Sequence, residues 1–125
     1  MEVSIIGNQN GCVHVRSSFG TFLGIWCSPR PPELRRYLVE LDSNDFVFPN
    51  AVLLSSQKQP NIQRQNGTTN VTGIFEGVDE GLLFLRIGTD LLMLETVQDY
   101  DYSKYIGQYV QIALSELLLY DLGLL

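Results

Sequence analysis

The chain has 125 residues, of which 45% are hydrophobic and 18% charged, and its formal net charge is −6. This composition excludes a disordered polar chain and fits one compact domain with its own core, although the low charged fraction leaves more apolar surface than a monomer usually shows. No apolar segment reaches the length of a membrane span and no secretion signal stands at the start, so we expect a cytoplasmic protein without membrane contact.

The first half of the chain predicts short strands joined by turns. Asn8-Gln-Asn-Gly11 predicts a tight hairpin turn, because Asn and Gly tolerate positive φ. Prolines end the third strand at residues 28–32, and residues 33–36 are expected to form one helical turn. The turn residues 42–45 predict a second hairpin between the strands on either side. The strands expected in this half are residues 3–7, 12–16, 19–26, 37–41, 46–48 and 51–54.

A polar segment, residues 57–70, separates the two halves. Ile62 is its only large apolar residue, so we expect a mobile loop or linker that adds little to the core. Strands are then expected at residues 71–78, 82–87, 91–96, 107–114 and 117–120. This spacing predicts a mainly β fold, an antiparallel small barrel or sandwich with one or two short helical turns. We expect a single domain over residues 1–125, with possible halves 1–56 and 71–125.

The pattern Gly-x-Phe-x-Gly occurs once in each half, at Gly20–Gly24 and at Gly73–Gly77. Each copy is followed by a predicted hairpin whose turn ends in an aspartate, Asp45 or Asp90, before three apolar residues. We infer that one small β module is used twice. The alternative is that glycine at strand bends and aspartate at turns recur in any β protein. In either case the last glycine of each copy is expected to spare a sharp bend a Cβ clash.

The negative charge is concentrated in the second half of the chain. Residues 1–65 hold six basic and five acidic side chains, whereas residues 66–125 hold two basic and nine acidic ones. An acidic surface repels phosphate backbones and raises the rate at which basic proteins are encountered. The sequence therefore predicts a basic protein partner and no direct binding to nucleic acid, since a nucleic-acid binder would show a basic stripe.

No set of residues matches a catalytic or metal-binding motif, so we expect neither a cofactor nor enzymatic activity. Strand alternation places Cys12 and His14 on one face with Cys27 nearby, but a zinc site would need a fourth ligand and closer cysteine spacing. A small hydrolase or isomerase that uses His14 is the enzymatic alternative. Its partner would be Cys12 or one of the carboxylates of the second module, which are Glu76, Asp79, Glu80 and Asp90.

The stretch Asp99-Tyr-Asp-Tyr-Ser-Lys-Tyr105 alternates acids with tyrosines. Tyrosine anchors protein interfaces at low entropic cost, and the acids would pair with a partner's arginines. The alternative is that Tyr105 and Tyr109 belong to the core and Asp101 caps a single turn of helix before Gly107. The predicted partner-binding residues are Asp99, Tyr100, Asp101 and Tyr102, together with the acids Glu76, Asp79 and Glu80.

The end of the chain, residues 116–125, is too apolar to remain free in water. We expect it to pack into the core, to form a homodimer, or to offer an edge strand to a partner. The last possibility would make the protein a structural adaptor. A chain truncated after Tyr120 would in that case stay folded and lose only assembly.

The small acidic β domain, the Asp and Tyr cluster at residues 99–105 and the missing catalytic set resemble cytoplasmic immunity proteins of bacterial contact-dependent or polymorphic toxin systems. The resemblance concerns general character over the whole chain and transfers no site residue. It implies a dedicated inhibitor, often of a nuclease, that blocks the toxin's active site or an adjacent surface. We therefore expect a non-enzymatic inhibitor of a basic toxin, with a structural adaptor or a small hydrolase or isomerase as alternatives.

Overall fold

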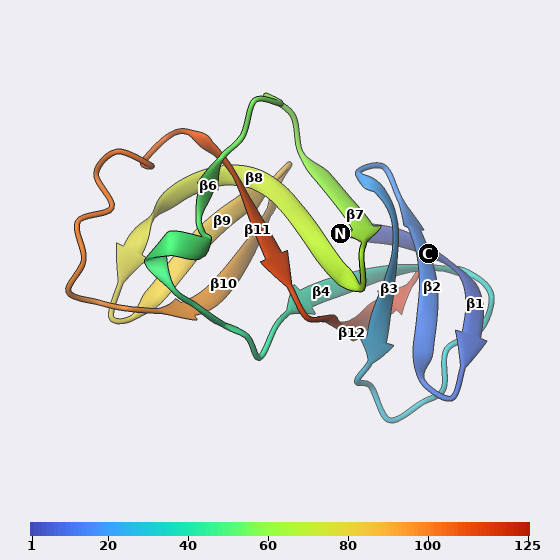
Figure 1. The fold of residues 1–125 in the computed structure, drawn as a ribbon. Coiled ribbons are helices and arrows are strands. Elements are labelled where there is room, and N and C mark those ends of the chain that lie inside the picture. The colour runs from blue at the N-terminus through green and yellow to red at the C-terminus, as the bar shows by residue number, and fades with distance from the viewer.

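The computed structural model describes residues 1–125 as two β lobes that lie side by side (Figure 1). The prediction of a mainly β barrel fold with a short helical turn is confirmed. No helix is long and apolar enough to cross a membrane. In chain order the elements are β1 (Glu2–Gln9), β2 (Cys12–Ser17), β3 (Gly20–Trp26), β4 (Arg36–Asp42), β5 (Phe46–Val47), the 3₁₀ turn η1 (Pro49–Ala51), β6 (Leu53–Leu54), β7 (Asn61–Gln65), β8 (Thr68–Asp79), β9 (Leu82–Ile87), β10 (Asp90–Thr96), β11 (Tyr109–Leu114) and β12 (Leu117–Leu124).

The first lobe is a closed barrel with the strand order β1-β2-β3-β12-β4. β1, β2 and β3 form an antiparallel meander, and β4 returns to pair with β1. β12 closes the barrel by lying parallel to β3 and antiparallel to β4. This is the connectivity of the five-stranded Greek-key barrel of the OB-fold. The closing strand comes from the far end of the chain.

The second lobe follows the same path, with the order β5-β10-β9-β8-β11-β6 and β7 paired to β8. The meander β8-β9-β10 corresponds to β1-β2-β3, and β11 corresponds to β4. The fifth position is shared by β5 and β6, which pair with β10 and β11 and are separated by η1. No strand pairing joins β5 to β6, so the second lobe is a seven-stranded sheet and not a closed barrel. Because it follows the path of the first lobe, we call the two lobes the first and the second barrel.

The register of the meanders repeats with residue numbers that differ by 70. Ile5 lies opposite Val15 in the first barrel, and Phe75 lies opposite Leu85 in the second. A β-bulge follows Ile5 and Phe75 alike, with a glycine two residues later in each strand. The structure thus contains one β module twice.

The two Gly-x-Phe-x-Gly copies are not equivalent positions of that module. With an offset of 70, Gly73–Gly77 corresponds to residues 3–7, and Gly20–Gly24 corresponds to residues 90–94. Gly77, at φ +154, lies in the bulge of β8, but a Cβ there would meet no atom within 4 Å, so the expected clash is absent and the backbone angle alone favours glycine. Gly24 has another role, because a Cβ there would lie 2.0 Å from Leu119 Cδ1 on the crossing strand β12.

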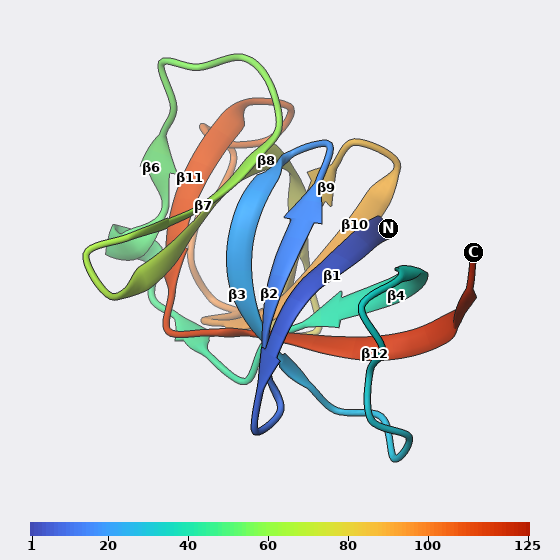
Figure 2. The ribbon, with the colours of Figure 1, turned by 90° about the vertical axis from the view of Figure 1, so that its right-hand side faces the viewer.

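The two modules exchange their fifth strands. β5 follows β4 of the first module but lies parallel to β10, with Phe46 opposite Glu95. β12 follows β11 of the second module but lies parallel to β3, with Leu118 opposite Ile25. Figure 2 shows β12 leaving β11 and running across the first barrel to the C-terminus. The expected halves 1–56 and 71–125 are therefore not two separate barrels, since each barrel needs a strand from the other half.

The C-terminal segment belongs to the first barrel. Leu117 and Leu119 are fully buried, and Asp121 and Leu124 pair with β4. A free edge strand for an adaptor is therefore not available in these residues. Leu122 and Leu125 remain exposed, so the predicted homodimer would have to rest on such outward side chains.

The second hairpin predicted around residues 42–45 does not form. The chain leaves β4 and crosses to the second barrel, where the Asp45 carboxylate accepts hydrogen bonds from the Ser115 backbone N–H at 2.6 Å and from its hydroxyl. This contact ties the start of β5 to the residue that follows β11 in the second barrel. The helical turn predicted at residues 33–36 is also wrong, because Arg36 already begins β4; the one helical turn is η1.

The polar segment, residues 57–70, is not a mobile loop. It forms the β7–β8 hairpin, with Asn66 and Gly67 at positive φ in its turn. Ile62 is fully buried, and its N–H donates to the Phe19 carbonyl of the first barrel at 2.9 Å. A Cβ on Gly20 would lie 2.2 Å from the Ile62 carbonyl oxygen, so this close approach requires glycine. The segment joins the two barrels.

All buried apolar side chains except that of Leu118 form a single cluster that spans both barrels. It runs from Val15 and Phe22 in the first barrel through Ile62 to Phe75 and Leu85 in the second. Because the core is continuous and the fifth strands are exchanged, we expect the two barrels to unfold as one cooperative unit.

Candidate functional site

The β8–β9 turn meets the segment that follows β10 at one end of the second barrel. The Gly81 N–H donates to the Gln98 side-chain oxygen, and the Gly81 carbonyl accepts from the Thr96 N–H at 2.9 Å. These bonds bring Asp79 and Glu80 close to the acidic segment that begins at Asp99, although the two segments are distant in sequence. We call this surface the acidic end and define it by the exposed residues Asp79, Glu80, Asp99, Tyr100, Asp101 and Ile106. Gln98, Ser103 and one base, Lys104, are exposed beside them.

A shallow hollow of about 230 Å³ lies in the acidic end. Its apolar wall consists of Val78, Tyr100, Tyr102 and Ile106, and Asp101 stands at its side. Tyr100 is 44% exposed and Ile106 is 54% exposed, so both offer contact area to a partner. Composition gave no signal for Ile106, an isolated aliphatic residue in a turn.

Tyr102 belongs to the core and also lines the hollow, so little of its surface is open to a partner. It is 5% exposed, and its hydroxyl donates to the Val97 carbonyl at 2.7 Å and lies 2.9 Å from Thr96 Oγ1. The rings of Tyr102 and Tyr105 each pack on Phe75 with centroids 5.6 Å apart. The core assignment of Tyr105 is thus confirmed. Together they form a fixed base on which Tyr100 rests, with its ring 5.0 Å from that of Tyr102.

Asp101 is held in place by the residues that follow it. Its carboxylate accepts a hydrogen bond from the Ser103 N–H at 3.0 Å. The side-chain and backbone hydrogen bonds from Ser103 lower the pKa of Asp101 below its ordinary value, and the nearby Lys104 adds to the effect. The carboxylate is therefore ionised at neutral pH and well into the acid range, as a site for a basic partner requires.

Glu76 and Asp90 lie outside the acidic end. Glu76 forms an ion pair with Arg86, which offsets its charge, on the outer face of β8 and β9. The pair lines a separate hollow of about 290 Å³ beside Phe84. Asp90 stands in the β9–β10 turn and pairs with the Met1 amino group at 2.8 Å. Asp90 is therefore engaged by the N-terminus, whereas Glu76 and Asp79 line the same hollow, in which Arg86 pairs with Glu76.

No hydrogen bond joins Cys12, His14 and Cys27 to one another. His14 is exposed on the outer face of β2, and both cysteines are free thiols. The Cys27 thiol donates to the Ile25 carbonyl at 3.5 Å. Cys27 also lies near Tyr120 and raises the pKa of its hydroxyl, with burial as a further cause. No three side chains among His, Cys, Asp and Glu lie close enough together to hold a metal ion.

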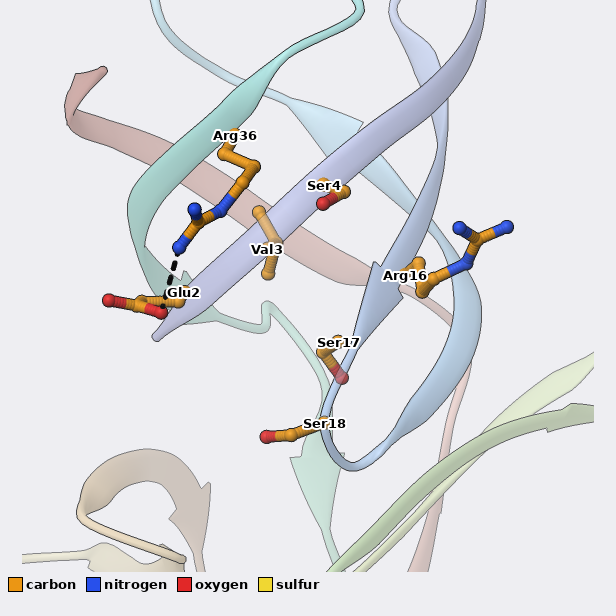
Figure 3. Close-up of a pocket in the computed structure, with 7 residues that line it drawn as sticks. All are labelled: Glu2, Val3, Ser4, Arg16, Ser17, Ser18 and Arg36. Carbon is orange, nitrogen blue, oxygen red and sulfur yellow. Dashed lines mark hydrogen bonds and ion pairs between the residues drawn. The ribbon is translucent and has the colours of Figure 1, made fainter. Parts of the chain in front are cut away.

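A second polar hollow, of about 240 Å³, lies on the first barrel (Figure 3). It contains Arg16 and Arg36 beside three serines, a composition that suits an anion. Arg36 forms an ion pair with Glu2 at 3.4 Å. Figure 3 shows the Arg16 side chain pointing away from Arg36. The Ser17 hydroxyl is used by the main chain, since it donates to the Gly20 carbonyl at 3.0 Å. The two guanidinium groups therefore do not converge on one ligand.

The charge of the protein is divided unequally between the barrels. Residues 45–116, which make up the second barrel, carry four basic and nine acidic side chains, a net charge of −5. The remaining residues carry a net charge of −1, which completes the total of −6. The acidic end thus stands on a negative barrel. Comparisons of the chain with protein-family models, with curated proteins and with solved structures give no match.

Proposed function

We propose that the protein is a non-enzymatic inhibitor that binds a basic protein partner through the acidic end. The observation that carries the proposal is the hollow of the acidic end, where exposed Tyr100 and Ile106 stand beside Asp101 on a buried aromatic base, with Asp79, Glu80 and Asp99 exposed on the adjoining segments. Such a surface combines apolar anchors with charges that guide encounter, the two properties that give protein interfaces affinity and speed.

The acidic end suits a partner with an arginine-rich or lysine-rich surface around a small apolar pocket. Tyr100 would fill the pocket at low entropic cost, because its ring already rests on Tyr102. A nuclease is a suitable partner, since an enzyme that holds phosphate backbones needs a basic surface. The carboxylates would compete with phosphate for that surface, and the bound inhibitor would block the nuclease. This is the action expected of an immunity protein.

The test is affinity capture from lysate of the native host, with three forms of the tagged protein compared by mass spectrometry. The first is the wild-type protein, and the second replaces the acidic end by Asp79→Asn, Glu80→Gln, Asp99→Asn, Tyr100→Ala and Asp101→Asn. The repeated module supplies a matched control, because residues 9, 10 and 30 of the first barrel correspond to residues 79, 80 and 100. The third form is therefore Gln9→Ala, Asn10→Ala and Arg30→Ala.

We expect wild type and control to retain the same basic protein and the acidic-end variant to lose it. Tyr100→Ala alone should weaken binding by about 2 kcal/mol, roughly 30-fold in affinity, if it is a central anchor. Retention of the same protein by all three forms would show that the acidic end is not the binding surface. Recovery of no basic protein by the wild type would contradict the proposed partner class.

A further inference from the structure

A polar cleft lies at the opposite end of β8 from the acidic end. It has a volume of about 180 Å³, and all nine residues that line it carry an uncharged hydroxyl or carboxamide group. Residues 55–57, which follow β6, form one wall. The floor is the outer face of three neighbouring strands and consists of Asn61, Gln63 and Gln65 of β7, Asn70 and Thr72 of β8, and Gln111 of β11.

The floor of the cleft is a regular array on a rigid sheet. Asn61 lies opposite Thr72, which in turn lies opposite Gln111, so these side chains form a row across the three strands. The other face of the same strands is fully buried at Ile62, and also at Val71 and Ile112. The buried face fixes the register of the three strands, and this register in turn fixes the positions of the polar side chains on the opposite face.

The stability of the fold does not explain this array. Asparagine is depleted in β-strands, yet two asparagines stand in the floor. The Asn70 amide donates to Gln65 at 3.0 Å, but the carboxamides of Asn61, Gln63 and Gln111 form no hydrogen bond with another protein group. Each free carboxamide offers two N–H donors and one carbonyl acceptor. The lining therefore presents many donors and acceptors and no charged side chain; the nearby Lys58 ammonium is engaged with the Ser55 carbonyl at 3.1 Å.

We propose that this cleft binds a neutral polyhydroxylated ligand, one sugar unit of an uncharged glycan. Hydroxyl groups both donate and accept, as do the carboxamides and hydroxyls that line the cleft. A phosphate or carboxylate ligand would call for Arg or Lys, a metal ion for carboxylates, and a lipid for apolar walls, and the cleft has none of these. Its volume is below the 300–1,000 Å³ or so of sites for drug-sized molecules, which suits a single ring.

The geometry favours a sugar over a peptide segment. Sheets recognise extended peptides through the open main-chain groups of an edge strand. The cleft instead lies over a sheet face and is lined by side chains, and β8 at its centre is paired on both sides. The first barrel has no such site, because its positions 2 and 38, which correspond to Thr72 and Gln111, are Glu and Leu.

Side-chain amide signals in ¹H–¹⁵N correlation spectra give a direct test. The full-length protein is titrated separately with maltohexaose, cellohexaose and chitohexaose, each to about 10 mM, the weak range typical of small ligands with few contacts. Polygalacturonate serves as the charged comparison and a capped Gly-Ser peptide as the peptide comparison. We expect at least one neutral oligosaccharide to shift the amide signals of Asn61, Gln63 and Gln111.

Gln63→Leu and Gln111→Leu should each weaken that binding at least tenfold, whereas Gln108→Leu, on an exposed residue outside the cleft, should not. Unchanged backbone signals of β8 show that the variants are folded. The proposal is overturned if no neutral oligosaccharide shifts these amides, or if the peptide or the polyanion binds there in their place. The outcome is independent of the proposed inhibitor function, because the test uses no protein partner.

Discussion

A chain that ends at Glu116 is expected to lose the two-barrel fold. The missing β12 removes Leu117, Leu118 and Leu119 from the core, where they are at most 6% exposed. Each buried leucine contributes about 1.5–3 kcal/mol, so the three together contribute about 5–9 kcal/mol. Total stabilities of domains are about 5–15 kcal/mol. The same truncation leaves β3 and β4 of the first barrel without their common neighbour.

Circular dichroism and the fluorescence of Trp26, the only tryptophan, measure this loss. Trp26 is 8% exposed, and its indole N–H donates to the Arg30 carbonyl in the first barrel, so unfolding should shift its emission to the red. A control chain that lacks only Leu124 and Leu125, both about half exposed, should stay folded. Addition of a peptide of residues 116–125 should restore the emission of the truncated chain. A truncated chain with cooperative unfolding and native emission would contradict the exchanged-strand fold.

Phe75→Ala is expected to lower the melting temperature of both barrels together. Phe75 is fully buried in the second barrel and supports Tyr102 and Tyr105. Truncation of a buried phenylalanine to alanine costs about 3–5 kcal/mol, which in a chain of this size lowers the melting temperature by roughly 10 °C or more. Because the core is continuous and the fifth strands cross, the loss should reach Trp26 in the first barrel.

Thermal unfolding followed by both circular dichroism and Trp26 fluorescence checks this coupling. The two transitions should coincide in the variant, as they should in the wild type. Phe75→Leu, which keeps much of the volume, should cause a smaller and equally shared decrease. A Trp26 transition that stays at the wild-type temperature while the overall β signal melts earlier would show two independent barrels. Phe75→Ala should also weaken partner capture, since Tyr100 rests on the tyrosine that Phe75 supports.

Most strands could be predicted because their signals are local. Alternation of buried and exposed positions defines β2 and β9, and the turn at Asn10 and Gly11 adopts the positive φ that its sequence favours. The mainly β class follows from such segments without knowledge of their partners. The β7–β8 hairpin was missed because one apolar residue in a polar segment gives no alternation, although Ile62 alone is enough to bury it.

The pairing of strands could not be predicted from local patterns. β5 and β12 lie parallel to strands of the opposite module, and no turn residue records such a distant partner. The repeat was detected at the wrong register, because only Gly7, Gly11 and Arg16 have identical counterparts among residues 3–28 when the offset is 70. The backbone conserves the module while the side chains have diverged, so a short shared motif is a poor guide to equivalence.

The candidate site was predicted in part. Composition located Asp79, Glu80 and the segment that begins at Asp99, and the Gly81 contacts bring these acids to one surface. Composition could not distinguish Tyr100 from Tyr102, since the segment is irregular and has no strand period to indicate which ring turns inward. Tyr102 turns inward because its hydroxyl finds hydrogen-bond partners there, and these partners depend on how the strands pack. Glu76 was misplaced because its ion pair with Arg86 depends on strand register.

The most direct measurement is the rate of association between the protein and its captured basic partner as a function of ionic strength. Electrostatic steering by the acidic end should make this rate fall about tenfold or more from low salt to above physiological salt. The variant with Asp79, Glu80, Asp99 and Asp101 neutralised should associate slowly at low salt and depend little on salt. An association rate of the wild-type protein that is the same at low and high salt, or a variant as fast as the wild type, would contradict the proposed function.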